Sequence, residues 1–241
     1  MIRFIIVCIF LILFLILSIP IFLVEWILGK FNPEKRDYSS LHIVQWAFRV
    51  IIRIAGITAT VIGEENVPDE PVLFIGNHRS YFDILLTYVR CKRLTGYVAK
   101  KEMEKIPLLS TWMRFLYCLF LNREDPREGL KMILTAIEYV KSGVSICIFP
   151  EGTRNKGEEL SLLPFKEGAF KIATKTGCPI VPISLNHTAA IFEDHFPRIK
   201  KTHVTIEYGK PIYPNDLDPD VKKHIGNYCQ NLISETIQRN A

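Results

Sequence analysis

The chain has 241 residues, of which 49% are hydrophobic, and its formal net charge is +5. This length suits one α/β domain of ordinary size with a short additional region. The sequence has no basic run with interleaved aromatics and no cysteine–histidine cluster with zinc-ligand spacing, which argues against nucleic-acid binding and against a metal site. Its six cysteines form no CxxC pair and lie mostly in apolar runs, so we expect reduced core residues in a cytosol-facing protein.

The first element is an apolar segment from Phe4 to Val24, interrupted only by Ser18 and Pro20. As a helix it would extend about 30 Å, enough to cross the hydrocarbon core of a bilayer. A secretory signal peptide would have a shorter apolar core followed by a small-residue cleavage site, whereas Glu25 and Trp26 follow here. We therefore expect a retained membrane anchor.

Basic residues predict how this anchor is oriented. Arg3 precedes it, and a larger basic group follows it, comprising Lys30, Lys35, Arg36, Arg49 and Arg53. The positive-inside rule then places the remainder of the chain on the cytoplasmic face. Pro20 also permits a kinked, re-entrant or interfacial hairpin, so spanning and monotopic insertion are both open.

A second helical pattern runs from Leu41 to Ile57, with apolar residues at helical spacing and aromatic and basic residues beside them. Such a helix either lies in the membrane interface or docks on the globular core, and the pattern favours neither. We expect a membrane-anchoring region at residues 1–57 and a globular domain at residues 58–241.

From residue 58 onward, short apolar runs alternate with helical patterns, which predicts an α/β fold with a mostly parallel central sheet flanked by helices. An N-terminal anchoring helix or helical hairpin completes this architecture. The predicted strands are Val72–Ile75, Gly96–Ala99, Cys118–Leu121, Val144–Phe149, Ile180–Ser184 and Val204–Tyr208.

Three helices are predicted in this part, at Pro126–Lys141, Lys166–Thr176 and Val221–Gln238. The first has Asp125 as its N-cap and Glu128 at the position that completes a capping box. Its expected buried stripe consists of Leu130, Ile133, Leu134, Ile137 and Val140.

A candidate catalytic pair, His78 and Asp83, follows the strand Val72–Ile75. Ligands of open α/β sheets bind beyond the carboxyl ends of the strands, where His78 lies. His78 by itself is equally compatible with a structural histidine that caps the next helix. If Asp83 lies on the first helical turn, its carboxylate can orient the imidazole and leave the other ring nitrogen as a base. That base would activate a hydroxyl of the substrate.

Glu151, Gly152, Thr153 and Arg154 follow the strand Val144–Phe149 and therefore lie at the same sheet edge. Gly152 lets the backbone approach a ligand closely, and the guanidinium of Arg154 offers a planar fork for a phosphate. Glu151 would orient that arginine or bind a substrate hydroxyl. A turn with a surface ion pair is the alternative interpretation.

Lys100, Lys101 and Arg123 also follow predicted strands. With Arg154 they would complete a pocket for an anion. Charged residues after strands are often only solvated, so each of these three is a weak indication when taken alone.

Together these segments resemble the glycerolipid acyltransferase family, in particular the bacterial membrane-bound 1-acyl-glycerol-3-phosphate acyltransferases. The similarity consists of four blocks in the family's order: the H-x4-D block Asn77–Asp83, a second block from Ala99 through Pro107 to Arg123, Phe149–Arg154, and Ile180–Ile183. Four blocks in order are far more specific than any one of them.

The resemblance implies that His78 deprotonates the 2-hydroxyl of lysophosphatidic acid, which then attacks the thioester of acyl-CoA or acyl carrier protein. It implies that Asp83 supports His78 and that Lys100 or Lys101, Arg123 and the segment Glu151 to Arg154 bind the substrate. The product would be phosphatidic acid, made at the cytoplasmic face of a bacterial cell membrane. No cofactor or metal is implied.

Other functions compete with this one. The acceptor would differ in an enzyme for glycerol-3-phosphate, another lysophospholipid or a lyso-aminolipid. A hydrolase would use the same pair on water, although the GxSxG elbow is absent. A lipid-binding scaffold would not need His78 or Asp83.

Overall fold

A seven-stranded sheet crosses the computed structural model of the protein, which describes residues 1–241. The strand order is β1-β7-β6-β2-β5-β3-β4, and only the β6–β7 pair is antiparallel. The predicted α/β class with a mostly parallel sheet is therefore confirmed. The strands are β1 Thr58–Ile62, β2 Leu73–Gly76, β3 Thr95–Lys100, β4 Leu119–Leu121, β5 Ser145–Ile148, β6 Ile180–Asn186 and β7 His203–Tyr208.

All six predicted strands are present, with ends within two residues of the prediction. The edge strand β1 was not predicted. Its five residues alternate between exposed and half-buried positions, and none is buried. An edge strand of this kind lacks the apolar run by which a buried parallel strand is recognised.

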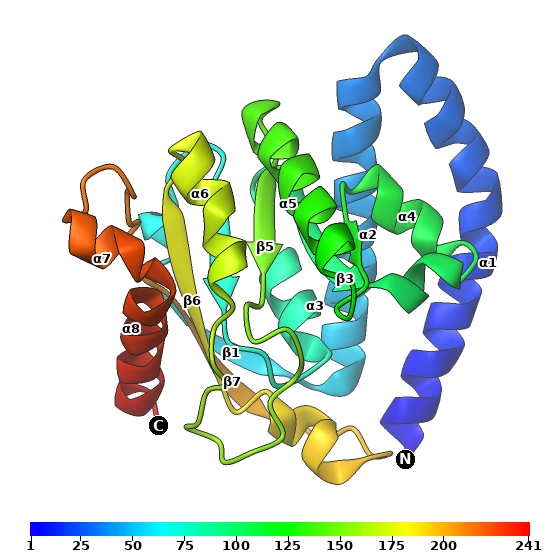
Figure 1. Cartoon of the computed structure of the whole chain (residues 1–241). Helices are drawn as coiled ribbons and strands as arrows, with labels where there is room; N and C mark the ends of the chain where they lie inside the picture. Colours follow the sequence, from blue (N-terminus) through cyan, green and yellow to red (C-terminus); the bar gives the residue numbers. More distant parts are fainter.

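Helices cover both faces of the sheet and form a hairpin at one side (Figure 1). They are α1 Ile2–Phe31, α2 Pro33–Ala55, α3 Phe82–Tyr88, α4 Leu109–Phe115, α5 Pro126–Lys141, α6 Lys171–Thr176, α7 Pro219–Lys223 and α8 Ile225–Arg239. One core cluster joins α2 and α3 to one face of the sheet, and a second joins α5, α6 and α8 to the other.

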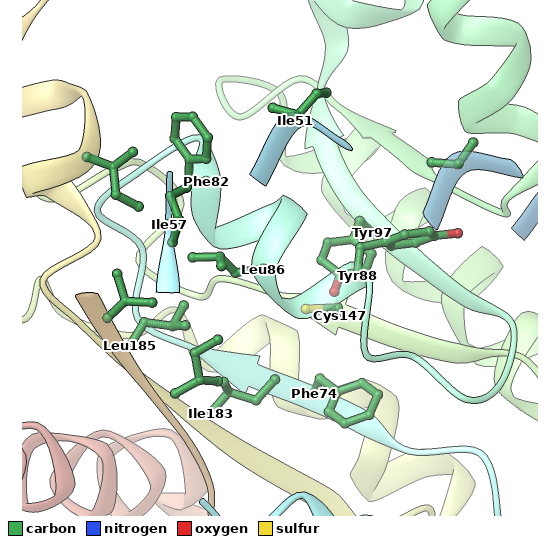
Figure 2. Packing of buried hydrophobic residues seen from close by; sticks show 14 of the residues in the cluster. Ile51, Ile57, Phe74, Phe82, Leu86, Tyr88, Tyr97, Cys147, Ile183 and Leu185 are labelled. Atoms are coloured by element: carbon green, nitrogen blue, oxygen red, sulfur yellow. The ribbon is translucent and has the colours of Figure 1, made fainter. Parts of the chain in front are cut away.

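Figure 2 shows the first cluster, in which Phe82, Leu86 and Tyr88 of α3 lie over the side chains of the sheet. Phe74 of β2 and Ile183 of β6 are among the sheet residues beneath them. This packing holds α3 against the strand that precedes it. The short connection between β2 and α3, which contains the H-x4-D segment, is consequently held at both ends.

The predicted anchor forms α1, which continues through Pro20 without a break. It is long and apolar enough to cross a membrane, and only 11% of its most apolar window is buried inside the protein. Large apolar side chains such as Ile12, Leu17 and Val24 are more than half exposed to the surroundings. This surface indicates membrane association.

The remaining side of α1 contacts the globular part along the length of the helix. Phe4 stacks on Phe192 with ring centroids 5.4 Å apart, and Ser18 Oγ accepts a 2.8 Å hydrogen bond from Trp112 Nε1. The helix turns back at Asn32, whose side chain caps α2 by accepting from the Lys35 amide. The hairpin is thus part of the same packed unit as the sheet.

Helix α2 docks on the globular core, which is one of the two arrangements that its pattern allowed. Leu41, Ala47 and Ile51 are no more than 2% exposed and belong to the buried surface. Gln45, also buried, donates from its amide to the carbonyls of Tyr88 and Cys91 at the end of α3.

Four details of the helix predictions are wrong, and the first three concern where helices begin, where they break and which face is buried. The helix predicted at residues 166–176 consists of a 3₁₀ turn, Glu167–Phe170, followed by the shorter helix α6. The last predicted helix is divided into α7 and α8 at His224, whose backbone angles are not helical. In α5, Leu130 and Leu134 are more than half exposed, since the buried stripe is rotated toward Met132, Ile133, Ala136, Ile137 and Val140.

The predicted start and end of α5 are confirmed, as is the cap by Asp125, which accepts from the amides of Arg127 and Glu128. The capping box does not form. The carboxylate of Glu128 instead lies 3.8 Å from Lys101 Nζ.

Candidate functional site

The carboxyl ends of four neighbouring parallel strands, in the order β2-β5-β3-β4, share one edge of the sheet. Every residue singled out from the sequence follows one of them. His78 comes after β2, Arg154 after β5, Lys100 ends β3 and Arg123 comes after β4. The topology therefore orders these residues in a row along the edge, with His78 at one end.

His78 and Asp83 are in direct contact, as expected from their placement on a turn and on the first turn of α3. His78 Nδ1 lies 2.9 Å from Asp83 Oδ2, and Asp83 is completely buried. The same carboxylate oxygen accepts 2.7 Å hydrogen bonds from the amides of Arg79 and Ser80. This one oxygen thus accepts three hydrogen bonds. They fix the backbone of the turn and the orientation of the imidazole.

The ring of His78 is also held on its flat side. It stacks on Phe149, just beyond β5, with ring centroids 4.4 Å apart and the planes 15° from parallel. The side chain retains 12% of its exposure, and Nε2 has no hydrogen-bond partner in the protein. A fixed imidazole with one nitrogen bound by a carboxylate and the other free is the geometry of a general base.

Glu151 braces the segment around His78. Its Oε1 accepts from the His78 amide at 2.7 Å and its Oε2 accepts from the Leu163 amide at 2.9 Å. Burial raises the pKa of this carboxyl group, while the two backbone hydrogen bonds act in the opposite direction. Both oxygens are therefore engaged with the backbone, and Glu151 is not the partner of Arg154.

Gly152 lies in the turn after β5 with φ of +74°, a conformation that side chains rarely adopt. A Cβ atom at this position would come within 2.8 Å of Lys166 Nζ. Thr153, the next residue, is exposed. The turn thus brings backbone, a hydroxyl and the ammonium group of Lys166 to one place. Lys166 is not among the residues predicted from the sequence, because it lies 12 positions beyond Arg154 in no recognisable motif.

Arg154 is held between two partners. Its Nη1 donates to Glu193 Oε1 at 3.0 Å, and its guanidinium carbon lies 3.7 Å from the centre of the Tyr81 ring. Tyr81 belongs to the H-x4-D segment, so Arg154 is adjacent to the turn that contains His78. The structure consequently brings Arg154 and the His78–Asp83 pair into one hydrogen-bonded network.

The other three cations lie farther along the edge. Neighbouring strands are about 4.8 Å apart, which puts the ends of β3 and β4 about 10 and 14 Å from the end of β2. Lys100 pairs with Glu102 at 3.0 Å, and Lys101 pairs with Glu104 at 3.2 Å. Arg123 is exposed and has no partner in the protein. None of the three contacts Arg154, although all face the same edge.

Two further residues, neither of them among the predicted site residues, link the segments around the site. Arg79 is buried, and its guanidinium donates to the carbonyls of Gly157 and Glu158, which fixes the loop after β5. Glu193 accepts from Ser80 Oγ, the Tyr81 amide and Arg154. Because β6 is parallel to β2, the residues after the predicted strand at 180–184 had to lie at this same edge.

Comparison with known proteins supports what the site suggests. The family described as Acyltransferase matches residues 58–186. The 1-acyl-sn-glycerol-3-phosphate acyltransferase of Saccharomyces cerevisiae is 29% identical over 81% of the chain and 66% of its own length. The chloroplastic 1-acyl-sn-glycerol-3-phosphate acyltransferase LPAT1 of Arabidopsis thaliana is 32% identical over 87% of the chain and 56% of its own length.

Among solved structures, the 1-acyl-sn-glycerophosphate (LPA) acyltransferase PlsC from Thermotoga maritima superposes with a TM-score of 0.75 at 25% identity. The alignment covers 94% of this chain and 93% of that one. The chain spans less than two thirds of the length of the yeast and plant relatives. Since the family match includes more than half of the residues together with the whole H-x4-D turn and the Glu151–Arg154 turn, the chain belongs to the acyltransferase family.

Proposed function

We propose that the protein transfers an acyl group from acyl-CoA or acyl carrier protein to the 2-hydroxyl of 1-acyl-glycerol-3-phosphate and so forms phosphatidic acid. The observation that carries this proposal is the free Nε2 of His78, on a ring fixed by Asp83 and Phe149 next to Arg154. The names of the yeast, plant and Thermotoga relatives support the same reaction.

In this reaction His78 Nε2 accepts the proton of the acceptor hydroxyl as the oxygen attacks the thioester carbonyl. The tetrahedral intermediate then collapses, the carbon–sulfur bond breaks, and the thiolate leaves with the proton that the imidazolium returns. Asp83 stabilises the imidazolium in between. No nucleophile from the protein is required, because the substrate supplies it.

Arg154 is the residue best placed to bind the phosphate of the acceptor. Its Nε and Nη2 groups have no partner in the protein, and the ammonium group of Lys166 lies beside the same turn. Gly152 and Thr153 line this turn, which Glu151 braces. Lys100, Lys101 and Arg123 are farther away, so they would attract the anionic substrates and hold the phosphate of the donor or acceptor less tightly.

The acceptor could also be glycerol-3-phosphate, another lysophospholipid or a lyso-aminolipid. The position of Arg154 favours an acceptor with a phosphate group close to the reacting hydroxyl, because the guanidinium adjoins the turn that contains His78. A panel of these acceptors, tested with wild type and Arg154→Ala, distinguishes them. The turnover of an acceptor without a phosphate should be the same in Arg154→Ala as in wild type.

Residues 1–57 would form the membrane-anchoring region and residues 58–241 the acyltransferase domain, on the cytoplasmic face. The contacts of α1 with Phe192 and Trp112, far apart along the helix, favour monotopic insertion. A helix attached to the domain at both places cannot cross a bilayer without drawing the domain into it. Protection of the N-terminus from an external protease in sealed vesicles of defined orientation would test this arrangement.

The test of the proposed activity is thioester-dependent formation of phosphatidic acid by the purified protein in detergent or lipid vesicles. We expect turnover by wild type and a loss of at least about a hundredfold in His78→Ala. Mass spectrometry of the product separates transfer from hydrolysis, since a hydrolase would release free fatty acid. Undiminished turnover in a folded His78→Ala protein would contradict the assignment of the base.

A further inference from the structure

The side chain of Arg154 needs contacts with other residues to keep a single orientation. The residue lies in the turn after β5, its side chain keeps 26% of its exposure, and a long side chain of this kind has many rotamers in water. The Tyr81 ring supports one flat side of the guanidinium, which restrains its height above the turn but not its rotation in the plane. A hydrogen bond in that plane is needed to fix the direction of the fork.

Glu193 supplies this bond. It lies in the 3₁₀ turn Glu193–His195, in the connection between β6 and β7, outside all four sequence blocks. Its Oε1 accepts from Arg154 Nη1 at 3.0 Å and from the Tyr81 amide at 2.8 Å, and its Oε2 accepts from Ser80 Oγ at 2.6 Å. The carboxylate thus links the phosphate-binding arginine to the turn that contains His78.

The position of Glu193 is itself well fixed. Phe192, the preceding residue, stacks on Phe4 of α1 and packs edge-on against Phe196. The Glu193 side chain keeps only 18% of its exposure, so its hydrogen bonds are partly shielded from water, which strengthens them. By contrast, Asp194 in the same turn is exposed and contacts no partner.

We propose that Glu193 is a positioning residue that aims the fork of Arg154 at the acceptor's phosphate, through the bond to Nη1. The inference rests on the proposed function. Glu193 occupies one nitrogen of the fork and leaves Nε and Nη2 directed away from it, free for two phosphate oxygens. It does not touch the reacting atoms, and the His78 turn is retained without it, because Asp83 still holds the amides of Arg79 and Ser80.

The experiment compares wild type with Glu193→Ala, Glu193→Gln and the matched control Asp194→Asn, each assayed with lysophosphatidic acid and with a monoacylglycerol. For Glu193→Ala we expect the KM for lysophosphatidic acid to rise about tenfold, with kcat changed by less than about twofold. Glu193→Gln keeps an acceptor oxygen and should raise this KM about threefold. The KM for monoacylglycerol and the kinetics of Asp194→Asn should not change.

A double-mutant cycle with Arg154→Ala decides whether Glu193 acts through the arginine. In the Arg154→Ala background, either Glu193 substitution should leave the KM for lysophosphatidic acid unchanged. An equal rise in both backgrounds would overturn the proposal, as would a KM that stays the same or falls in Glu193→Ala. A fall would mean that Glu193 competes with the phosphate for Arg154.

Two further outcomes are distinguishable. If Glu193→Ala fails to fold, as judged by thermal unfolding, Glu193→Gln alone carries the test through the same cycle. Wild type that forms no phosphatidic acid would contradict the proposed function and the positioning role together. An active wild type with an unaltered Glu193→Ala variant would contradict the positioning role alone.

Discussion

The two halves of the candidate site differ in how they are held. At the β2 end, His78, Asp83 and Glu151 are tied to backbone amides and to one another, and both carboxylates are buried. At the β3–β4 end, Lys100 and Lys101 pair only with exposed or half-exposed glutamates on the same surface. The first half is held rigidly, as the proposed proton transfer requires, whereas the ion pairs of the second half are free to exchange partners.

This difference has a physical reason. A proton transfer requires atoms held within about half an ångström, which packing and a network of hydrogen bonds can secure. Attraction of a charged substrate depends on net potential over a wider area and tolerates movement. Substitutions in the two halves should therefore differ in which kinetic parameter they change and by how much.

The largest effect is expected for Asp83→Asn. The amide oxygen can take the place of Oδ2 and accept from Arg79 and Ser80, while its NH2 group takes the place of Oδ1, which is buried without a partner. The fold should survive, but the charge that stabilises the imidazolium is lost. We expect kcat to fall about a thousandfold with a small change in KM. Retention of a tenth of the wild-type kcat would show that Asp83 is only structural.

A smaller effect is expected for Glu151→Gln, which breaks the brace without removing a reacting group. The amide can accept from only one of the two backbone N–H groups, His78 or Leu163, and leaves the other unpaired at a cost of about 1–3 kcal/mol. We expect a lower melting temperature and a roughly tenfold decrease in kcat/KM. Loss of activity as complete as in His78→Ala would instead indicate a direct chemical role.

A still smaller effect is expected in the outer half. Arg123→Ala should raise the KM for the phosphorylated substrates about threefold and leave kcat unchanged, and the rise should disappear at high salt. Lys101→Ala should do less, since the hydrogen bond to Glu104 already engages that ammonium group and raises its pKa. Steady-state kinetics at low and high ionic strength measure both. A decrease in kcat that survives in high salt would place Arg123 inside the reactive half.

The smallest expected effect is on how the stability of the fold depends on pH. Burial raises the folded-state pKa of Glu151, so the stability that this group contributes is present at low pH and is lost as the pH rises through that pKa. Lys101 and Arg114 lower the pKa of Glu104, whose contribution is present above its unfolded pKa and lost as the pH falls. The two carboxylates should therefore respond to acid in opposite directions.

Urea unfolding in mild detergent at pH 4 and pH 7 tests this contrast. The stability difference between wild type and Glu151→Gln should be larger at pH 4, and the difference between wild type and Glu104→Gln should be larger at pH 7. The same direction for both variants would contradict the contrast between a buried and an exposed half.

Much of the reactive half could be predicted from sequence because it is local. The His78–Asp83 contact joins residues five positions apart at the start of a helix, and the parallel strands place Arg154 at the same edge. The partner of Arg154 could not be identified in this way. Glu193 is 39 residues farther along the chain, and nothing in its neighbourhood marks it as part of the site.

The fold could be predicted wherever burial imposes a pattern. The strands inside the sheet were found, whereas β1, at the edge and without a buried residue, was not. In α5 the ends were right because Asp125, Pro126 and the last turn are local signals. Its buried face was wrong at Leu130 and Leu134, since which apolar side of a helix meets the sheet depends on neighbours far away in sequence.

The position of β1 in the sheet also determines when this strand can fold during synthesis of the chain. This strand pairs only with β7, so Thr58–Ile62 leaves the ribosome long before its single partner, His203–Tyr208, has been made. Until then its backbone amides and carbonyls have no strand partner and are bonded to water or to another chain. Nascent chains halted before residue 203 should consequently be sensitive to protease near residue 60. Helix α1 has emerged well before this point, but the sheet is complete only when nearly the whole polypeptide has been made.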